Sequence, residues 1–396
     1  MTTEVIDKVV PGKQCDADRS LLDLIYHTEL ATKPGVSRLP KKYMGLSDSE
    51  IDARIRAAKA KLGDRLVVLG HHYQRDEIIK YADYRGDSYK LSKSAAAKPS
   101  ADYIVFCGVH FMAESADILA QPHQRVILPN LSAGCSMADM APTEDVLQCW
   151  DDLQAIEGVK GKVLPVTYIN STAALKAFCG ANGGLVCTSS NAKAVVTWGL
   201  SQREKILFFP DQHLGRNTAL KMGYSVDDTV LWDPFQPMGG NTPEALRKAK
   251  FILWKGHCSV HKRFTVEQVQ DARKRYPGVK VIVHPECPRE TVALADYDGS
   301  TEFIIRTVTE APSGTTWAVG TEINLVNRLA HENPDKTVFC LDPVICPCST
   351  MYRIHPAYLL WVLEELVEGN VVNEIKVADE IAHWARVALE RMLATV

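Results

Sequence analysis

The sequence predicts an α/β protein in which parallel strands alternate with crossover helices, and three observations lead to this prediction. Short apolar runs rich in Val, Ile, Leu and Phe alternate with helix-like stretches along most of the chain, as is typical of strands buried on both faces of a sheet. The runs form three sets that open alike at intervals of about 85–100 residues, the size of a small α/β unit. Polar side chains gather where the runs end, and open parallel sheets bind ligands at the carboxyl ends of their strands.

Each predicted strand is a short run of apolar and β-branched residues that ends in polar or turn-forming residues. In chain order the predicted strands are Leu66–Leu69, Tyr103–Phe106, Val126–Leu128, Val163–Tyr168, Leu185–Cys187, Ile206–Phe209, Phe251–Trp254, Val279–Val283, Phe303–Ile305, Thr316–Val319 and Val338–Leu341. Helices are predicted where apolar residues recur at helical spacing. They are Asp16–Lys33, Asn191–Leu200, Thr265–Tyr276, Ala357–Val367 and Val377–Leu393.

The three sets of strands predict the division of the chain. The first set runs into Gly70–Gln74, the second into Tyr168–Ser171 and the third into Trp254–Cys258. We therefore expect an N-terminal extension at residues 1–55, a first unit at 56–148, a second at 149–240 and a third at 241–349. The C-terminal helices, within residues 350–396, are expected to pack with the first unit.

Composition narrows the class of protein. The chain has 396 residues, 46% of them hydrophobic, and a formal net charge of -3, which is typical of a globular protein with a large core. It has no Lys/Arg run of five or more, so we expect no nucleic-acid partner. The first residues, Met1–Lys8, lack signal-peptide character, and no apolar stretch reaches the ~18–20 residues that cross a membrane. We expect a cytoplasmic protein without membrane association.

Three of the eleven cysteines stand where strand-like runs give way to loops: Cys135, Cys258 and Cys348. An odd count without an export signal argues against a disulfide framework. Three thiolates can hold a four-iron cluster and leave one iron open to substrate. The alternative is ordinary core packing, which suits Cys107, Cys187 and Cys340 because each ends an apolar run.

The motifs of the chain, taken together and in order, resemble the iron–sulfur quinolinate synthase family from about Gly70 to the C-terminal helices. The segments that carry the resemblance are His71–Gln74, Gly86–Ser92, Gly108–Glu114, Gly134–Cys135, Tyr168–Ser171, Thr188–Asn191, Pro210–Gly215, His284–Glu286 and Gly299–Thr301. The resemblance implies three similar αβα units with small parallel sheets about a pseudo-threefold axis, with the active site at their shared centre. It also implies one [4Fe–4S] cluster per chain, with three cysteine ligands and one open iron.

The reaction implied by the resemblance is that of a transferase in NAD biosynthesis. Iminoaspartate condenses with dihydroxyacetone phosphate to give quinolinate, phosphate and water, with the open iron acting as a Lewis acid. A transient hand-over of the imine from L-aspartate oxidase is a further hypothesis. The family's third ligand stands three residues before a Met, which favours Cys348, before Met351, over the neighbouring Cys346.

The substrates are anionic, so the site needs hydroxyl, amide and imidazole donors. Hydroxyls at strand-to-helix turns, where helix N-termini also attract anions, are expected at Ser88, Ser189, Ser300 and Thr301; helix capping is the simpler role for each. The family pattern adds His71, Asn170, His261 and His284 to the substrate-binding set. It assigns acid–base work to Tyr73, Tyr168, His284 and Glu286, and the last three also contact substrate.

Three rival readings remain open at this point. A zinc deaminase would suit His284-x-Glu286, but its Pro-Cys-x-x-Cys motif is broken because Met351 follows Pro347-Cys348 at the place of the second cysteine. A hydro-lyase with an open-site cluster is compatible with the cysteines, whereas an electron carrier would need four ligands. Relative to shorter family members the chain has an extension of about 50 residues, a glycine-rich insertion near Gly180–Gly184 and a longer connection through Tyr224–Asn241, all expected at the surface.

Overall fold

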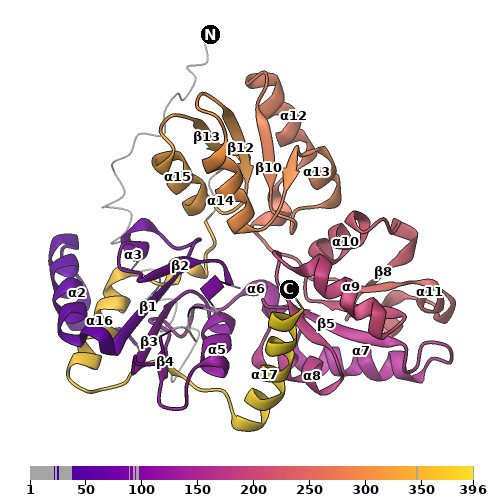
Figure 1. Ribbon diagram of the computed structural model, residues 1–396, viewed down its shortest axis with the longest axis horizontal. Helices are drawn as coiled ribbons and strands as arrows, with labels where there is room; N and C mark the ends of the chain where they lie inside the picture. The colour runs from indigo at the N-terminus through magenta and orange to yellow at the C-terminus, as the bar shows by residue number, and fades with distance from the viewer. Residues whose placement is uncertain are drawn as a thin grey trace.

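The computed structural model describes residues 22, 25, 38–88, 90–91, 94, 98–344 and 347–395. The helix predicted at Asp16–Lys33 falls almost entirely outside these residues, and so does Cys346. In the described part the chain forms three separate sheets, each flanked by helices. The α/β class with several small parallel sheets is therefore confirmed, and Figure 1 shows the three sheets in three lobes that surround a common centre.

The first sheet has the strand order β14-β4-β3-β1-β2, and its strands are parallel except for β14, which runs antiparallel to β4. Its strands are β1 (Leu66–His71), β2 (Tyr84–Gly86), β3 (Tyr103–Cys107), β4 (Arg125–Ile127) and β14 (Glu374–Ile375). The helices of this lobe are α2 (Asp48–Leu62), α3 (Asp76–Ile79), α5 (His110–Leu119) and α6 (Ser136–Asp139). All six residues of β1 are buried, because helices cover both faces of a parallel sheet.

The second sheet is entirely parallel, in the order β6-β5-β7-β9-β8. Its strands are β5 (Val163–Tyr168), β6 (Leu185–Cys187), β7 (Lys205–Phe209), β8 (Thr229–Trp232) and β9 (Phe251–Trp254). The helices are α7 (Thr143–Ala155), α8 (Ala173–Ala181), α9 (Ala192–Gln202), α10 (Gln212–Lys221) and α11 (Pro243–Lys248).

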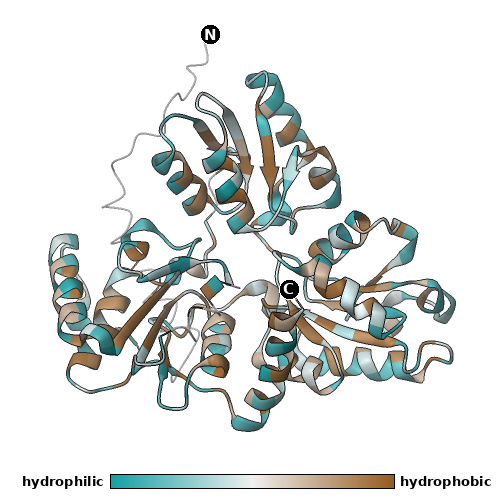
Figure 2. Cartoon of the chain, in the orientation of Figure 1, coloured by the Kyte–Doolittle hydropathy of each residue, from teal (hydrophilic) through white to brown (hydrophobic). Residues whose placement is uncertain are grey.

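The third sheet is also parallel, in the order β11-β10-β12-β13. Its strands are β10 (Lys280–Val283), β11 (Tyr297–Asp298), β12 (Thr316–Gly320) and β13 (Thr337–Cys340). The helices are α12 (Val266–Arg275), α13 (Arg289–Leu294), α14 (Thr301–Glu310) and α15 (Ile323–Glu332). In all three lobes the strands are the hydrophobic interior, and the helices turn hydrophilic faces outward (Figure 2).

The C-terminal segment contacts two lobes, whereas the prediction named only the first unit as its partner. Helix α16 (Pro356–Val367) packs on α2, and β14 extends the first sheet. Helix α17 (Asp379–Ala394) packs mainly against α8 and β6 of the second lobe and also contacts α5 of the first. The approach is close because a Cβ on Gly180 would lie 2.0 Å from the carbonyl oxygen of Trp384. Gly180 and Gly184 are therefore buried packing positions, and the expectation of a surface insertion is wrong for them.

The boundary between the second and third units also differs from the prediction. Strand β9 pairs with β7 and β8, so the second sheet ends at Trp254 and not before residue 241. The connection through Tyr224–Asn241, expected to be a surface loop, contains β8 and the buried Trp232. The third sheet therefore opens with β10 and the turn at His284, and the domain division, with this boundary moved, stays a prediction.

One predicted strand is wrong, and four short strands were not predicted. Residues 303–305 lie in α14, because the Ser300 side chain caps this helix and Ile304 and Val308, four apart, form its buried face. The unpredicted strands have two to four residues each, and most of their side chains are exposed or half-exposed: β2, β8, β11 and β14.

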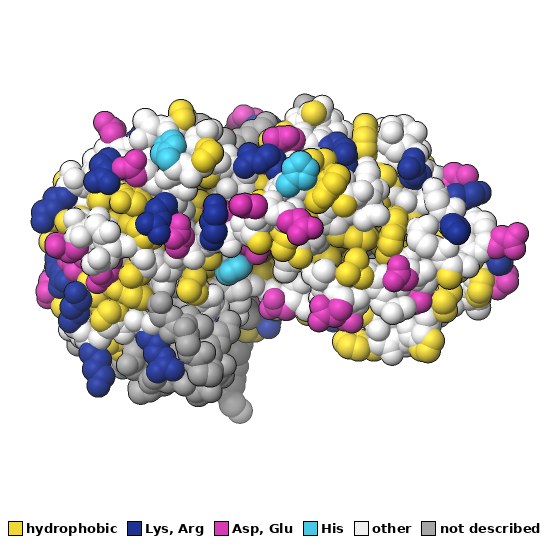
Figure 3. Space-filling view, turned by 90° about the horizontal axis from the view of Figure 1, so that it is seen from below, with side chains coloured by type: hydrophobic (Ala, Val, Ile, Leu, Met, Phe, Trp, Pro, Cys, Tyr) yellow, Lys and Arg dark blue, Asp and Glu magenta, His cyan; other side chains and the backbone are white. Residues whose placement is uncertain are grey.

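The surface agrees with the modest net charge. On the face shown in Figure 3, Lys and Arg side chains are interspersed with Asp and Glu side chains, and no broad patch of one sign is seen among the described residues. No helix in the described ranges is both long enough and apolar enough to cross a membrane.

Candidate active site

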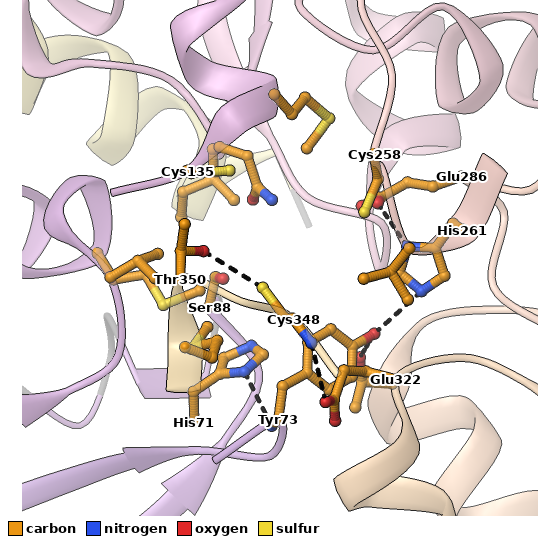
Figure 4. Close-up of a pocket in the computed structure, with 18 of the residues that line it drawn as sticks. His71, Tyr73, Ser88, Cys135, Cys258, His261, Glu286, Glu322, Cys348 and Thr350 are labelled. Carbon is orange, nitrogen blue, oxygen red and sulfur yellow. Dashed lines mark hydrogen bonds and ion pairs between the residues drawn. The ribbon is translucent and has the colours of Figure 1, made fainter. Parts of the chain in front are cut away.

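A cavity lies where the carboxyl ends of strands from all three sheets face one another. Figure 4 shows its walls, with the labelled side chains coming from all three lobes. Of the predicted site residues, only Ser300 is absent from the lining, because its hydroxyl accepts the Phe303 N–H as the cap of α14. The predicted residues that line the cavity are His71, Tyr73, Ser88, Cys135, Tyr168, Asn170, Ser189, Cys258, His261, His284, Glu286, Thr301 and Cys348.

The three cysteines occupy equivalent places in the three sheets. Cys135 follows β4, Cys258 follows β9 and Cys348 follows β13, and each of these is the last parallel strand of its sheet in chain order. All three are half-buried, unpaired thiols that line the same cavity from different sides (Figure 4). The Cys348 amide donates to Glu322 Oε1 at 3.3 Å, which ties its loop to the turn after β12.

The chemistry of this donor set fits a thiolate-bound metal cluster. Burial raises the pKa of Cys135 to about 12, and burial also raises the pKa of Cys258 and Cys348. No Lys or Arg is among the described residues that line the cavity, so the protein supplies no cationic side chain there to stabilise three thiolates. Bound metal ions would supply that charge and displace the thiol protons. The Asn170 Oδ1 atom, buried without a partner in the described residues, leaves a further acceptor in the wall.

A smaller grouping could hold a single ion. Ligand atoms of Cys258, His261 and Glu286 lie within 4.8 Å of one another. However, His261 Nδ1 already contacts Glu286 Oε2 at 2.8 Å, and Glu286 Oε1 accepts the Tyr168 hydroxyl at 2.5 Å. A mononuclear site here would have to break this network, whereas the three thiols are not engaged with one another.

The Glu286 carboxylate is the centre of a buried network from two lobes. It accepts from Tyr168 and His261, and His284 Nδ1 lies 3.7 Å from Oε1. The His261 and His284 rings stack with centroids 4.4 Å apart. Burial alone would raise the pKa of Glu286, but the two imidazoles and the hydrogen bonds together hold it below its usual value. Burial raises the pKa of Tyr168 well above its usual value, so this hydroxyl keeps its proton.

The same local hydrogen bond, from a backbone amide two residues later, fixes the tautomer of two histidines. His71 Nδ1 accepts the Tyr73 amide at 3.1 Å, and His284 Nδ1 accepts the Glu286 amide at 3.4 Å. Burial lowers the pKa of each imidazole to about 3, so both are neutral near pH 7. With Nδ1 as the acceptor, Nε2 carries the proton and is the donor available to a ligand.

Sequence reasoning missed several residues of the site, among them Thr321 and Glu322. They follow β12 directly, so the rule that placed His71 and His284 at strand ends could have found them. Glu322 is buried in the cavity wall, and burial raises its pKa to about 7. Thr321 Oγ1 lies 2.8 Å from the Tyr73 hydroxyl.

The three sheets end at one buried cavity, which holds three thiols and a coupled carboxylate, imidazole and phenol. This arrangement defines an α/β enzyme with a candidate metal centre. Residues 53–394 match the family model described as Quinolinate synthetase A protein, and the chain belongs to that family.

Curated relatives agree over nearly their whole length. A protein of Corynebacterium glutamicum is 59% identical over 366 residues, which cover 92% of this chain and 93% of the relative. A protein of Nocardioides sp. is 59% identical over 385 residues, covering 96% and 97%, and one of Geobacillus kaustophilus is 53% identical, covering 91% and 97%. All three are named Quinolinate synthase.

Proposed function

We propose that this protein is a quinolinate synthase of NAD biosynthesis, which condenses iminoaspartate with dihydroxyacetone phosphate to give quinolinate, phosphate and water. Membership of the family supports the activity. The observation that carries the chemistry is the meeting of three thiols, one after each sheet, at a cavity whose lining includes no Lys or Arg among the described residues.

Cys135, Cys258 and Cys348 are the residues that would hold a [4Fe–4S] cluster in this cavity. Such a cluster with one open iron supplies a Lewis acid that polarises a substrate oxygen. A neutral thiol is a poor ligand, so the raised pKa values of these cysteines make cluster assembly a proton-releasing step.

Substrate anions are held in this proposal by neutral donors. Thr301 is the first residue of α14, a helix of ten residues, so it lies at the positive end of the helix dipole, which favours a phosphate or carboxylate. Ser88 and Ser189 add hydroxyls from the first and second lobes. His71 and His284 add their Nε2 protons. Neutral donors orient a polyanion without the tight ion pairs that would slow product release.

Proton transfers fall to the network around Glu286. Ring closure requires removal of protons from carbon and their delivery to leaving oxygens. Glu286 is the carboxylate that can accept a proton, and Tyr168, bonded to it at 2.5 Å, is a hydroxyl that can donate one. Tyr73, in the first lobe, offers a second phenol to the cavity.

Anaerobic purification followed by metal and activity analysis tests the proposal. We expect about four irons and four sulfides per chain and quinolinate formation from the two substrates. A zinc-containing protein without iron would contradict it, and so would a full cluster that forms no quinolinate. The hand-over from L-aspartate oxidase is tested by adding an imine scavenger while the oxidase generates the substrate, because a direct hand-over protects the yield.

The third ligand is tested by separate replacements. Cys348→Ser should lose the cluster and activity, whereas Cys346→Ser should keep both. Cys287→Ser is the matched control, because Cys287 is a buried thiol of the same lobe that lies outside the cavity lining. A full cluster in Cys348→Ser would show that another residue is the ligand.

A further inference from the structure

Lys176 is a fully buried lysine that lies close behind the wall of the cavity. It belongs to α8, and its side chain is 0% exposed. Its Nζ atom lies 5.5 Å from the centroid of the Phe111 ring, which lines the cavity. The same atom donates to the carbonyl of Ser171, the residue after the cavity-lining Asn170. The ammonium group therefore contacts wall segments of both the first and the second lobe.

This ammonium group forms no ion pair with any acidic side chain in the described part of the chain. Glu114 is the carboxylate that most favours its charged form, but Glu114 Oε2 accepts the Ala173 amide at 2.9 Å. Burial lowers the pKa of Lys176 to about 8, so the side chain is still mostly protonated at pH 7. An unpaired charge in a protein interior is costly, which makes such a group a candidate for a functional role.

The hydrogen bond to Ser171 does not by itself require a charge. A neutral amide holds the equivalent turn of the third lobe, where Asn217 donates to the carbonyls of Pro285 and Cys287 at 2.8 and 2.9 Å. What a lysine adds at Ser171 is a positive potential beside the cavity. The cavity lining includes three cysteines and a carboxylate network but no Lys or Arg among the described residues.

We propose that Lys176 supplies, from behind the wall, the positive charge that the cavity lining lacks: it strengthens the binding of anionic ligands and stabilises the reduced state of a cluster held by the three cysteines. This inference rests on the proposed function for the identity of the ligand and of the cluster. A charge acts across a buried wall because the protein interior screens it less than water does. Since Lys176 is not a lining residue, it attracts an anion without forming a direct ion pair with it.

Three replacements separate the charge from the hydrogen bond. Lys176→Gln removes the charge and retains a donor for the Ser171 carbonyl, Lys176→Met removes both, and Lys176→Arg retains the charge. Lys205→Gln is the matched control, because Lys205 is 4% exposed and its Nζ donates to the carbonyls of Arg247 and Ala249. Lys205 is the first residue of β7, so it lies at the edge of the second sheet opposite the cavity.

Ligand binding without turnover measures the effect of the charge. The probes are quinolinate, a dianion, and pyridine-2-carboxylate, a monoanion with the same ring nitrogen and adjacent carboxylate. In the anaerobically purified chain we expect Lys176→Gln and Lys176→Met to bind quinolinate about 10-fold more weakly and pyridine-2-carboxylate about threefold more weakly. Lys176→Arg and Lys205→Gln should stay within about threefold of wild type for both probes. An equal loss for the two probes would overturn the inference, because a charge effect must grow with the charge of the ligand.

The reduction potential of the ligand-free, cluster-loaded chain gives a second readout. Reduction adds one electron to the cluster, so the potential should become more negative in Lys176→Gln and stay unchanged in Lys176→Arg and Lys205→Gln. An unchanged potential in Lys176→Gln would overturn the inference, and so would failure of both uncharged variants to fold, since Lys176 would then be structural. A wild-type chain with a full cluster that forms no quinolinate would overturn the proposed function alone, because the potential still decides the role of Lys176.

Discussion

The turns after β1 and β10, which begin at His71 and at His284, are built alike but present different chemistry. In each turn the histidine Nδ1 accepts the amide two residues later. That later residue is Tyr73 in the first lobe and Glu286 in the third. The shared frame therefore orients a neutral imidazole in both places, and a single side chain decides whether the wall offers a phenol or a carboxylate.

The backbones of the two turns are also held alike. Arg328, from the third lobe, donates to the carbonyls one and three residues after His71, at 2.8 and 2.6 Å. Asn217, from the second lobe, donates to the carbonyls one and three residues after His284, at 2.8 and 2.9 Å. Each turn is thus completed by a side chain from a neighbouring lobe, so the geometry of the site depends on how the lobes are assembled.

Replacement of the carboxylate should have the largest effect. Glu286→Gln keeps the shape of the side chain but removes the charge that accepts from Tyr168 and His261. We expect kcat to fall about 10³-fold, within the usual range for loss of a general base. Steady-state quinolinate formation measures it, with the exposed Glu310→Gln as control. A decrease in kcat of less than tenfold would show that Glu286 does not take part in proton transfer.

Replacement of the equivalent phenol should have a smaller effect. Tyr73→Phe removes one donor from the cavity but leaves Glu286 and Tyr168 bonded. We expect kcat to fall about 10²-fold at unchanged iron content. The half-exposed Tyr297→Phe is the control, because this ring lies outside the cavity lining. If Tyr73→Phe proved more damaging than Glu286→Gln, the division of roles between the two turns would be wrong.

Arg328 and Asn217, which bond the backbones of the two turns, should both stabilise the fold, and the charged Arg328 should contribute more than the neutral Asn217. Arg328→Met leaves two carbonyls without their donor and should lower the free energy of unfolding by about 2–4 kcal/mol. Asn217→Leu removes a neutral donor and should cost about 1–3 kcal/mol. Urea denaturation measures both, with the exposed Arg306→Met as control. Equal free energies of unfolding for Arg328→Met and wild type would show that the first turn does not depend on the hydrogen bonds from Arg328.

The two buried histidines should make the free energy of unfolding depend on pH, and this dependence tests whether His71 and His284 have equivalent surroundings. Burial lowers the pKa of His71 and His284 to about 3, below the value of about 6.5 in the unfolded chain. Below pH 6.5 the unfolded chain therefore binds more protons, and stability falls as pH falls. Each histidine contributes a slope of up to about 1.4 kcal/mol per pH unit between about pH 6 and 4. Denaturation at several pH values should show His71→Asn and His284→Asn reducing the slope equally, and unequal changes would contradict the comparison.

Local sequence rules predicted much of this site. A polar residue close after an apolar run pointed to His71 and His284, since a parallel strand ends at the ligand-binding edge whatever its neighbours are. Tyr168 came from the family resemblance. The same rule was not applied to Thr321 and Glu322, although they follow β12 in the same way. The error at Phe303–Ile305 arose because three apolar residues suit a strand as well as one face of a helix, and the Ser300 cap decided for the helix.

The sequence by itself determined the α/β class, ten of the strands and part of the cavity lining, because burial periodicity and strand-end polarity are local properties. Only the tertiary structure decided which sheet β9 joins, where α17 packs and which donors satisfy the turns after β1 and β10. These outcomes depend on contacts between residues tens to hundreds of positions apart, and no local pattern encodes such partners. The two turns look unrelated as sequence, and they become equivalent only when neighbouring lobes supply Arg328 and Asn217.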